Sequence, residues 1–243
     1  MKILILMAYY NRPHIVKNAL ESIKSQNYGD WELAFVDDGS DVPGKKIVED
    51  ILKDSLHKVK FFNTNHTRQD KQLNGGSVFG SLWNEAMYNS DADIAIMLCD
   101  DDALYPDSLQ QLRDYYKQNK DVVYSYGHVS IFDPYATQDF DSLVESKINT
   151  NWFLNKTRSI HPVNNVDASQ VSWRIENATK DNLKFPPIRT ISLDAVLYEQ
   201  LYNSYGHCVF NGILVQYKGV HSDQLGQRLN NPYETKEMND RTI

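Results

Sequence analysis

The sequence has few cysteines, no excess of basic residues and no long apolar stretch. Only two cysteines, Cys99 and Cys208, occur in 243 residues, and their spacing fits neither a disulfide framework nor a zinc cluster. The 25 Lys and Arg residues are outnumbered by 32 Asp and Glu residues and are scattered along the chain, so we expect no nucleic-acid partner. The apolar stretches are too short to cross a bilayer, so we expect no transmembrane segment and a cytoplasmic location.

The hydrophobic pattern alternates between strand and helix along the chain. Short continuous apolar runs predict buried strands, and apolar residues three or four positions apart predict helices. The pattern predicts strands over 1–10, 31–36, 59–62, 94–98 and 122–127, and helices over about 15–23, 45–56 and 107–118, with a further helix around Leu82 and Met87. This order indicates a single α/β domain over residues 1–243, with a mostly parallel central sheet flanked by helices.

Two of the predicted strands end in clusters of carboxylates. Asp37 and Asp38 follow the strand over 31–36, and Asp100, Asp101 and Asp102 follow the strand over 94–98. In a parallel sheet these ends lie at one edge, where ligands bind. Carboxylates this close destabilise one another unless a cation or hydrogen-bond donors compensate, and Mg²⁺ or Mn²⁺ is the simplest such cation. A solvated acidic loop is the alternative.

Five segments of the chain occur together in an order that is known from one enzyme family. They cover residues 8–13, 20–26, 36–40, 75–84 and 98–106. In them the sequence resembles the family 2 glycosyltransferases of the GT-A fold, over nearly the first half of the chain. The resemblance implies that residues 1–106 bind a nucleotide sugar and residues 107–243 bind the acceptor. It also implies an inverting, metal-dependent transfer from a nucleotide-diphosphate donor, with a UDP-sugar favoured, to the hydroxyl of a carbohydrate or other acceptor.

The resemblance assigns nucleotide binding to the ends of three predicted strands. Asp38, with Asp37 beside it, accepts a hydrogen bond from the base, Tyr9 and Tyr10 stack on or flank the base, and Asp100 contacts the ribose. The full set of nucleotide-binding residues is Ala8, Tyr9, Tyr10, Arg12, Asp37, Asp38 and Asp100.

The same resemblance assigns metal and donor-sugar contacts. Asp101 binds the Mn²⁺ or Mg²⁺ that bridges the diphosphate, and Asp102 either supports the metal site without touching the ion or contacts the donor sugar. The segment from Val215 resembles the last strand of the family, and His221 after it is a second metal candidate, with an ordinary surface histidine as the alternative. Cys99 stands where many members of the family carry a first metal-binding Asp, and we expect it to be a small buried residue at the end of a strand.

Three residues of the second half complete the expected site. Gln170 and Trp173 correspond to positions that line the donor sugar in the family, although a lone Trp more often belongs to the core. Asp194, just before an apolar-periodic helix that ends near 205–206, is the candidate general base. Its alternative role is that of an ordinary Asp at a helix N-terminus, and Leu193 stands where the family commonly has Glu.

Three other classes of protein compete with this interpretation. A haloacid-dehalogenase-like phosphatase also has Asp after an apolar strand, but Asp102 is followed by Ala103 and Leu104 rather than by the residues that class requires. A nucleotidyltransferase usually has a glycine-rich loop after its first strand, and residues 9–12 contain no glycine. A non-catalytic protein that binds nucleotide sugars would fit the positions of Cys99 and Leu193.

Overall fold

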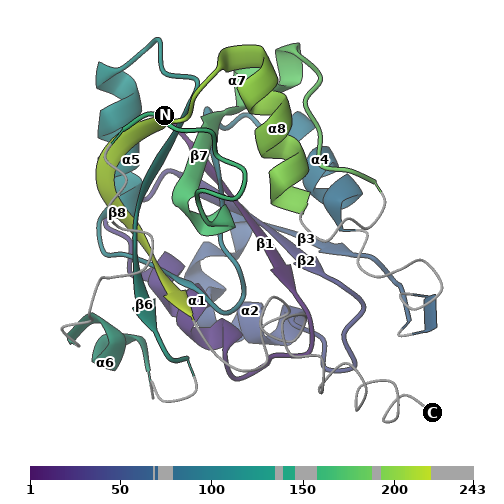
Figure 1. Ribbon diagram of the computed structural model, residues 1–243. Helices are drawn as coiled ribbons and strands as arrows, with labels where there is room; N and C mark the ends of the chain where they lie inside the picture. The colour runs from purple at the N-terminus through teal and green to yellow at the C-terminus, as the bar shows by residue number, and fades with distance from the viewer. Residues whose placement is uncertain (68, 71–78, 135–138, 146–157, 188–192, 220–243) are drawn as a thin grey trace, which may run out of the picture.

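The computed structural model describes residues 1–67, 69–70, 79–134, 139–145, 158–187 and 193–219 (Figure 1). Its strands are β1 (Ile3–Tyr9), β2 (Trp31–Asp37), β3 (Val59–Asn63), β4 (Ile94–Met97), β5 (Ala103–Leu104), β6 (Tyr124–Phe132), β7 (Val171–Arg174) and β8 (Val209–Gly219). Its helices are α1 (Val16–Lys24), α2 (Lys45–Ile51), α4 (Gly80–Tyr88), α5 (Ser108–Gln118), α6 (Phe140–Glu145), α7 (Ile175–Lys180) and α8 (Leu193–Tyr205), with 3₁₀ helices η1 (Lys53–Lys58) and η2 (Ala168–Gln170).

The described strands form one mixed sheet in the order β3-β2-β1-β4-β7-β6-β8-β5. Strands β3, β2, β1 and β4 are parallel, β7 is antiparallel to both of its neighbours, and β6 is again parallel to β8. The short strand β5 runs antiparallel to β8. The predicted α/β class with a mostly parallel sheet is therefore confirmed.

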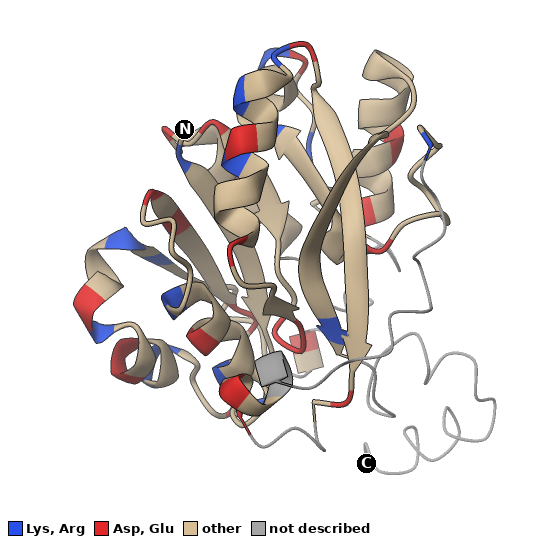
Figure 2. Cartoon of the chain, turned by 90° about the vertical axis from the view of Figure 1, so that its left-hand side faces the viewer, with Lys and Arg blue, Asp and Glu red and all other residues tan. Residues whose placement is uncertain are grey.

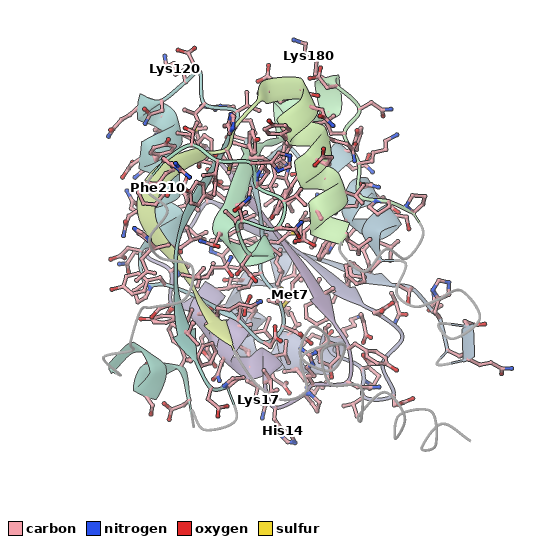
Figure 3. All side chains as sticks on the ribbon, viewed as in Figure 1. Met7, His14, Lys17, Lys120, Lys180 and Phe210 are labelled. Carbon is pink, nitrogen blue, oxygen red and sulfur yellow. The ribbon has the colours of Figure 1, made fainter. Side chains whose placement is uncertain are left out.

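Hydrophobic layers cover both faces of the sheet, as parallel strands require. Along β1, Leu4 and Leu6 pack with residues of α4, α7 and α8, whereas Ile3, Ile5 and Met7 pack with residues of α1, α2 and α5. Successive side chains of a strand point to opposite faces, so this one strand contributes to both cores. Met7 accordingly lies near the middle of the molecule in Figure 3.

Charged side chains are spread over the outside of these layers. On the side drawn in Figure 2, acidic and basic residues alternate over the helices and loops, and the described Lys and Arg residues form no continuous stripe there. Within the described ranges, no helix combines the length and the hydropathy needed to cross a membrane.

Two elements differ from the sequence-based prediction, each for a local reason. The predicted helix over 45–56 is divided, because Leu52 leaves the helical region with φ −99° and ψ 21° and the chain continues as the 3₁₀ helix η1. Strand β8 begins at Val209, earlier than the apolar run from Val215 suggests. The cause is Gly212, whose φ of +74° accompanies a shift in the β6–β8 register and interrupts the sequence alternation.

A buried hydroxyl group ties α5 to the sheet. The Tyr116 hydroxyl donates a hydrogen bond to the carbonyl oxygen of Ser172 at 2.7 Å, and it lies 3.1 Å from Ser125 Oγ and 3.0 Å from Ser172 Oγ. Tyr116 and both serines are buried. This cluster joins α5 to β6 and β7, which lie side by side in the sheet.

Replacing Tyr116 by Phe tests this cluster. We expect Tyr116→Phe to lower the free energy of unfolding by about 1–3 kcal/mol, because buried polar partners lose a hydrogen bond without gaining water. Urea denaturation measures the change. The control is Tyr115→Phe, a partly exposed neighbour on the same helix, for which we expect a smaller loss. Equal losses for both variants would contradict the assigned role of the cluster.

Candidate functional site

The two carboxylate clusters lie on either side of the end of β1. In the sheet β1 pairs with β2 through Tyr9 and Asp37, and with β4 through Leu6 and Met97. The segments that follow β2, β1 and β4 therefore leave the sheet at one edge, which is the lower edge in Figure 1. The expectation that both clusters occupy the same edge is confirmed.

Arg12 connects the end of β1 to the acidic segment after β4. Its Nη1 atom lies 2.9 Å from Asp100 Oδ1 and 2.9 Å from Asp101 Oδ2. The backbone N–H of Tyr10 donates to the other oxygen of Asp100 at 3.3 Å. Burial disfavours the charge on Arg12, but Asp100 and Asp101 outweigh that effect and raise its pKa. In the structure a guanidinium thus compensates the repulsion between these carboxylates.

Asp37 shapes the loop that follows β2. Its Oδ1 atom accepts a hydrogen bond from the backbone N–H of Ser40 at 2.8 Å, and its Oδ2 atom accepts one from Gly44 at 2.9 Å. Both oxygens of this buried carboxylate are therefore engaged by the protein backbone. This geometry gives Asp37 a structural role in the loop after β2.

The same loop is held from β1 by Asn11. The Asn11 side-chain oxygen accepts from the backbone N–H of Asp41 at 2.8 Å, and its own backbone N–H donates to Ser40 Oγ at 3.1 Å. Gly39 has φ +68°, and a Cβ atom there would lie 2.0 Å from the carbonyl oxygen of His66. Only glycine fits at this position without moving the backbone.

Asp38 lies at the junction of three strands. Its backbone N–H donates to the carbonyl oxygen of Tyr9 at 2.9 Å, and its Oδ1 atom accepts from Thr64 Oγ1 at 3.1 Å. Thr64 directly follows β3, so that strand also contributes a polar group to the edge. Thr64 was not predicted from the sequence, because a single Thr after a strand carries no recognisable signal.

Strand alternation separates the three residues at the end of β1. Tyr9 is completely buried, its ring stacks on Phe35 and its hydroxyl donates to the carbonyl oxygen of Val42. Burial, followed by the charge of Asp37, raises the Tyr9 pKa to about 12. Ala8 packs on the opposite core. Tyr10 is 36% exposed and is the most solvent-accessible residue of the three.

The side chain of Asp102 is completely buried and is held by residues of β8. Its Oδ1 atom accepts from the backbone N–H of Gly219 at 2.9 Å, and its Oδ2 atom lies 3.3 Å from Lys218 Nζ. Lys218 also lies 3.3 Å from Asp167 Oδ1. Burial raises the pKa of Asp102 to about 8; Lys218 opposes this rise, whereas Asp101 and Asp167 add to it. One lysine is thus shared between two carboxylates.

Lys218 and Gly219 are functional-site neighbours that the sequence analysis missed. The signal available was a lone Lys within an apolar strand, which is unusual for a buried position. Burial disfavours the charge on Lys218, but the combined charges of Asp102, Asp167 and their neighbours outweigh this effect and raise the Lys218 pKa well above its usual value. At Gly219 a Cβ atom would lie 2.0 Å from the carbonyl oxygen of Asp101, so β8 directly abuts the acidic segment.

Three side chains of this segment come close enough to share a cation. One ligand atom each of Cys99, Asp101 and Asp102 lies within 4.8 Å of the others. Desolvation, together with the charges of Asp102 and Asp101, raises the pKa of the Cys99 thiol well above its usual value, although the side chain retains some exposure. Metals bind thiolate rather than thiol, so the carboxylates are the available donors. A carboxylate joined by phosphate oxygens is a donor set that suits Mg²⁺ or Mn²⁺.

The structure corrects the expectation for Gln170 and Trp173. Trp173 is completely buried, its Nε1 atom points to Met87 Sδ at 3.4 Å and its ring packs edge-on against Phe185. It belongs to the core, which was its alternative role. Gln170 is buried too; its side chain accepts from the Asp167 backbone N–H and donates to the Gly127 carbonyl, each at 2.7 Å. Both side chains hold the fold and offer no surface to a sugar.

Asp194 lies in the first turn of α8, which spans Leu193–Tyr205 and is followed by Gly206 with φ +77°. The predicted helix is therefore confirmed. One turn later the Tyr198 hydroxyl donates to the carbonyl oxygen of Ala168, next to the Asp167 that pairs with Lys218. Through Asp167 and Lys218, this contact joins the start of α8 to the edge of the sheet at which the carboxylates after β2 and β4 lie. His221 and the turn at 75–76 lie outside the described residues.

Comparison with known proteins identifies both the fold and the family of this chain. Solved GT-A-like structures superimpose on nearly the whole chain, as detailed below. The sequence profile described as Glycosyl transferase family 2 matches residues 4–168, and the chain belongs to this family. This membership decides against the phosphatase and nucleotidyltransferase alternatives.

Individual relatives are distant. An uncharacterized glycosyltransferase of Nostoc sp. is 25% identical over 134 residues, which is 55% of this chain and 38% of that protein. TarS of S. aureus, solved with UDP-GlcNAc, superimposes with a TM-score of 0.69 at 14% identity over 92% of this chain and 60% of that one. The mannosyltransferase PcManGT of Pyrobaculum calidifontis, solved with GDP-Man and Mn²⁺, gives 0.59 at 15% over 100% and 65%. The chain spans less than two thirds of each of these proteins.

Replacing Asp37 by Asn tests whether this carboxylate builds the loop. The substitution keeps the shape but turns one acceptor into a donor that faces a backbone N–H. We expect the free energy of unfolding to fall by about 1–3 kcal/mol, as measured by chemical denaturation. Asp41→Asn, an exposed change in the same loop, is the control and should cost less. An Asp37→Asn variant as stable as the wild type would contradict the structural role.

Proposed function

We propose that the protein is an inverting glycosyltransferase that moves a sugar from a nucleotide-diphosphate donor, with a UDP-sugar favoured, to an acceptor hydroxyl. One observation carries the proposal. In a chain of family 2, the carboxylates after β2 and β4 lie on either side of Tyr10, a residue that is 36% exposed, at the carboxyl edge of the sheet. An aromatic face beside hydrogen-bond acceptors is the combination that recognises a nucleoside.

Within this proposal Asp38 and Asp100 orient the nucleoside. The imide N–H of uracil is a donor, so a carboxylate such as Asp38 is a suitable partner for it. Asp100 accepts hydrogen bonds from the ribose hydroxyls, while the ion pair with Arg12 holds the Asp100 carboxylate in place. The preference for uridine is supported by TarS, which has been solved with UDP-GlcNAc, whereas PcManGT has been solved with GDP-Man.

Asp101 is the proposed ligand of Mn²⁺ or Mg²⁺, with His221 as a second one. A bound cation would neutralise the charge that develops on the departing diphosphate. PcManGT supports this part, because it has been solved with Mn²⁺. Asp102 is held by Gly219 and Lys218, and in this way it stabilises the acidic segment after β4 that contains Asp101.

Asp194 is the proposed general base. Its carboxylate takes the proton of the acceptor hydroxyl while that oxygen forms its bond to the anomeric carbon. The bond between that carbon and the diphosphate breaks in the same step, and the nucleoside diphosphate leaves with the electron pair. A single displacement of this kind inverts the configuration at the anomeric carbon. The contact between Tyr198 and Ala168, which links α8 to the carboxylate edge, supports this assignment.

A second candidate function is binding of nucleotide sugars without transfer. It is favoured by Cys99 and Leu193, which stand where carboxylates are common in the family. The two functions differ in turnover and not in donor affinity.

A thermal-shift panel tests donor binding. Because a ligand that binds only the folded state raises the melting temperature, UDP, GDP, UDP-GlcNAc and GDP-Man are each added with and without Mn²⁺. We expect uridine nucleotides to stabilise the protein and Mn²⁺ to increase the effect. No shift with any nucleotide would remove the basis of the proposal, and a response to guanosine nucleotides alone would change the donor.

Two variants separate binding from transfer. Asp101→Asn should lose the part of donor binding that depends on Mn²⁺, because a metal ligand is removed. Asp194→Asn should retain donor binding and lower sugar transfer by about 10²-fold or more, because only the base is removed. Asp114→Asn, a change on α5 away from the edge, is the control for both. Transfer that survives in Asp194→Asn would contradict its role as base.

A further inference from the structure

Arg12 lies between Asp100 and Asp101, the two carboxylates to which the proposed function assigns the ribose and the metal. One nitrogen, Nη1, lies 2.9 Å from both Asp100 and Asp101, whose side chains are nearly buried, and the Arg12 side chain is itself only 28% exposed. A guanidinium is never deprotonated in proteins, so this positive charge is permanent. The protein therefore supplies its own cation at the carboxylate edge.

A divalent cation on Asp101 and the guanidinium on the same carboxylate repel each other. At a separation of about 5 Å, such repulsion changes a binding constant by more than about tenfold even at the dielectric constant of bulk water. A nucleoside diphosphate changes this balance, because its phosphate oxygens complete the metal coordination and accept hydrogen bonds from a guanidinium. Cation and nucleotide then favour each other's binding by the same factor.

We propose that Arg12 is a built-in counter-ion that competes with the divalent cation for Asp101 and so makes metal binding depend on the nucleotide. Without donor, Arg12 neutralises Asp100 and Asp101 and keeps the affinity for free metal low. When the donor binds, Arg12 leaves Asp101 to the cation and pairs with Asp100 and the diphosphate. This inference rests on the proposed function and adds a mechanism that regulates the affinity of its metal site for the divalent cation.

Direct metal titration tests the inference. Binding of Mn²⁺ is followed by the loss of the electron paramagnetic resonance signal of free Mn²⁺, with and without UDP. We expect Arg12→Gln to bind Mn²⁺ alone at least about tenfold more tightly than the wild type. We also expect UDP to improve Mn²⁺ affinity by a smaller factor in the variant than in the wild type. Adding Asp101→Asn to Arg12→Gln should abolish the gain.

Three further variants make the result specific. Arg12→Lys keeps the charge and should bind Mn²⁺ alone as weakly as the wild type. Arg113→Gln removes an Arg of similar exposure from α5, where it pairs with Asp114, and should also behave as the wild type. If Arg12→Gln does not fold, as judged by its melting transition, Arg12→Met keeps the apolar stem and removes the charge.

The outcomes separate this inference from the proposed function. If neutral variants of Arg12 bind Mn²⁺ alone no more tightly than the wild type, while the wild type binds Mn²⁺ with UDP, the counter-ion role is wrong and the donor site stands. If the wild type binds Mn²⁺ neither alone nor with UDP, the metal-dependent function fails and the counter-ion role fails with it.

Discussion

Repulsion between carboxylates at one edge of the sheet is the constraint on which the rest of this site depends. Asp37, Asp38, Asp100, Asp101 and Asp102 are all nearly buried, where like charges cost most. Each carboxylate has a hydrogen-bond donor or a cation that offsets this repulsion. These are backbone N–H groups for Asp37, Thr64 for Asp38, Arg12 for Asp100 and Asp101, and Lys218 for Asp102. Each carboxylate is thereby fixed in a defined orientation before any ligand arrives.

This arrangement divides the carboxylates into two groups with different duties. Asp37 and Asp102 turn both oxygens towards the protein and hold the loops after β2 and β4. The neighbouring Asp38, Asp100 and Asp101 sit on the loops so held. Rigid supports of this kind are what precise ligand contacts require, because a loosely held carboxylate loses binding energy to its own ordering.

Local sequence patterns predicted the strands and their common edge, whereas the partners of the carboxylates depend on long-range contacts that such patterns do not show. The apolar runs ending in Asp38 and Asp100 predicted the parallel strands and their common edge, because strand type and chain direction are properties of short segments. Partners such as Thr64 and Lys218 were missed, since their contacts depend on sheet order and register. Trp173 was misassigned for a related reason. Its alternating strand shows that it faces one side of the sheet, but only the packing of α4 and α7 shows that this side is closed.

The anchoring of Asp102 by β8 has a consequence for how the chain matures. Lys218 and Gly219 lie 116 and 117 positions after the aspartate they neutralise. During synthesis β1, β2, β3 and β4 leave the ribosome long before β8 does, and they can already pair with one another. The nascent sheet therefore carries Asp102 without Lys218 and Gly219 until β8 is added, whereas Arg12 is already present for Asp100 and Asp101. Completion of β8 is therefore the event that fixes the side chain of Asp102 in the segment after β4.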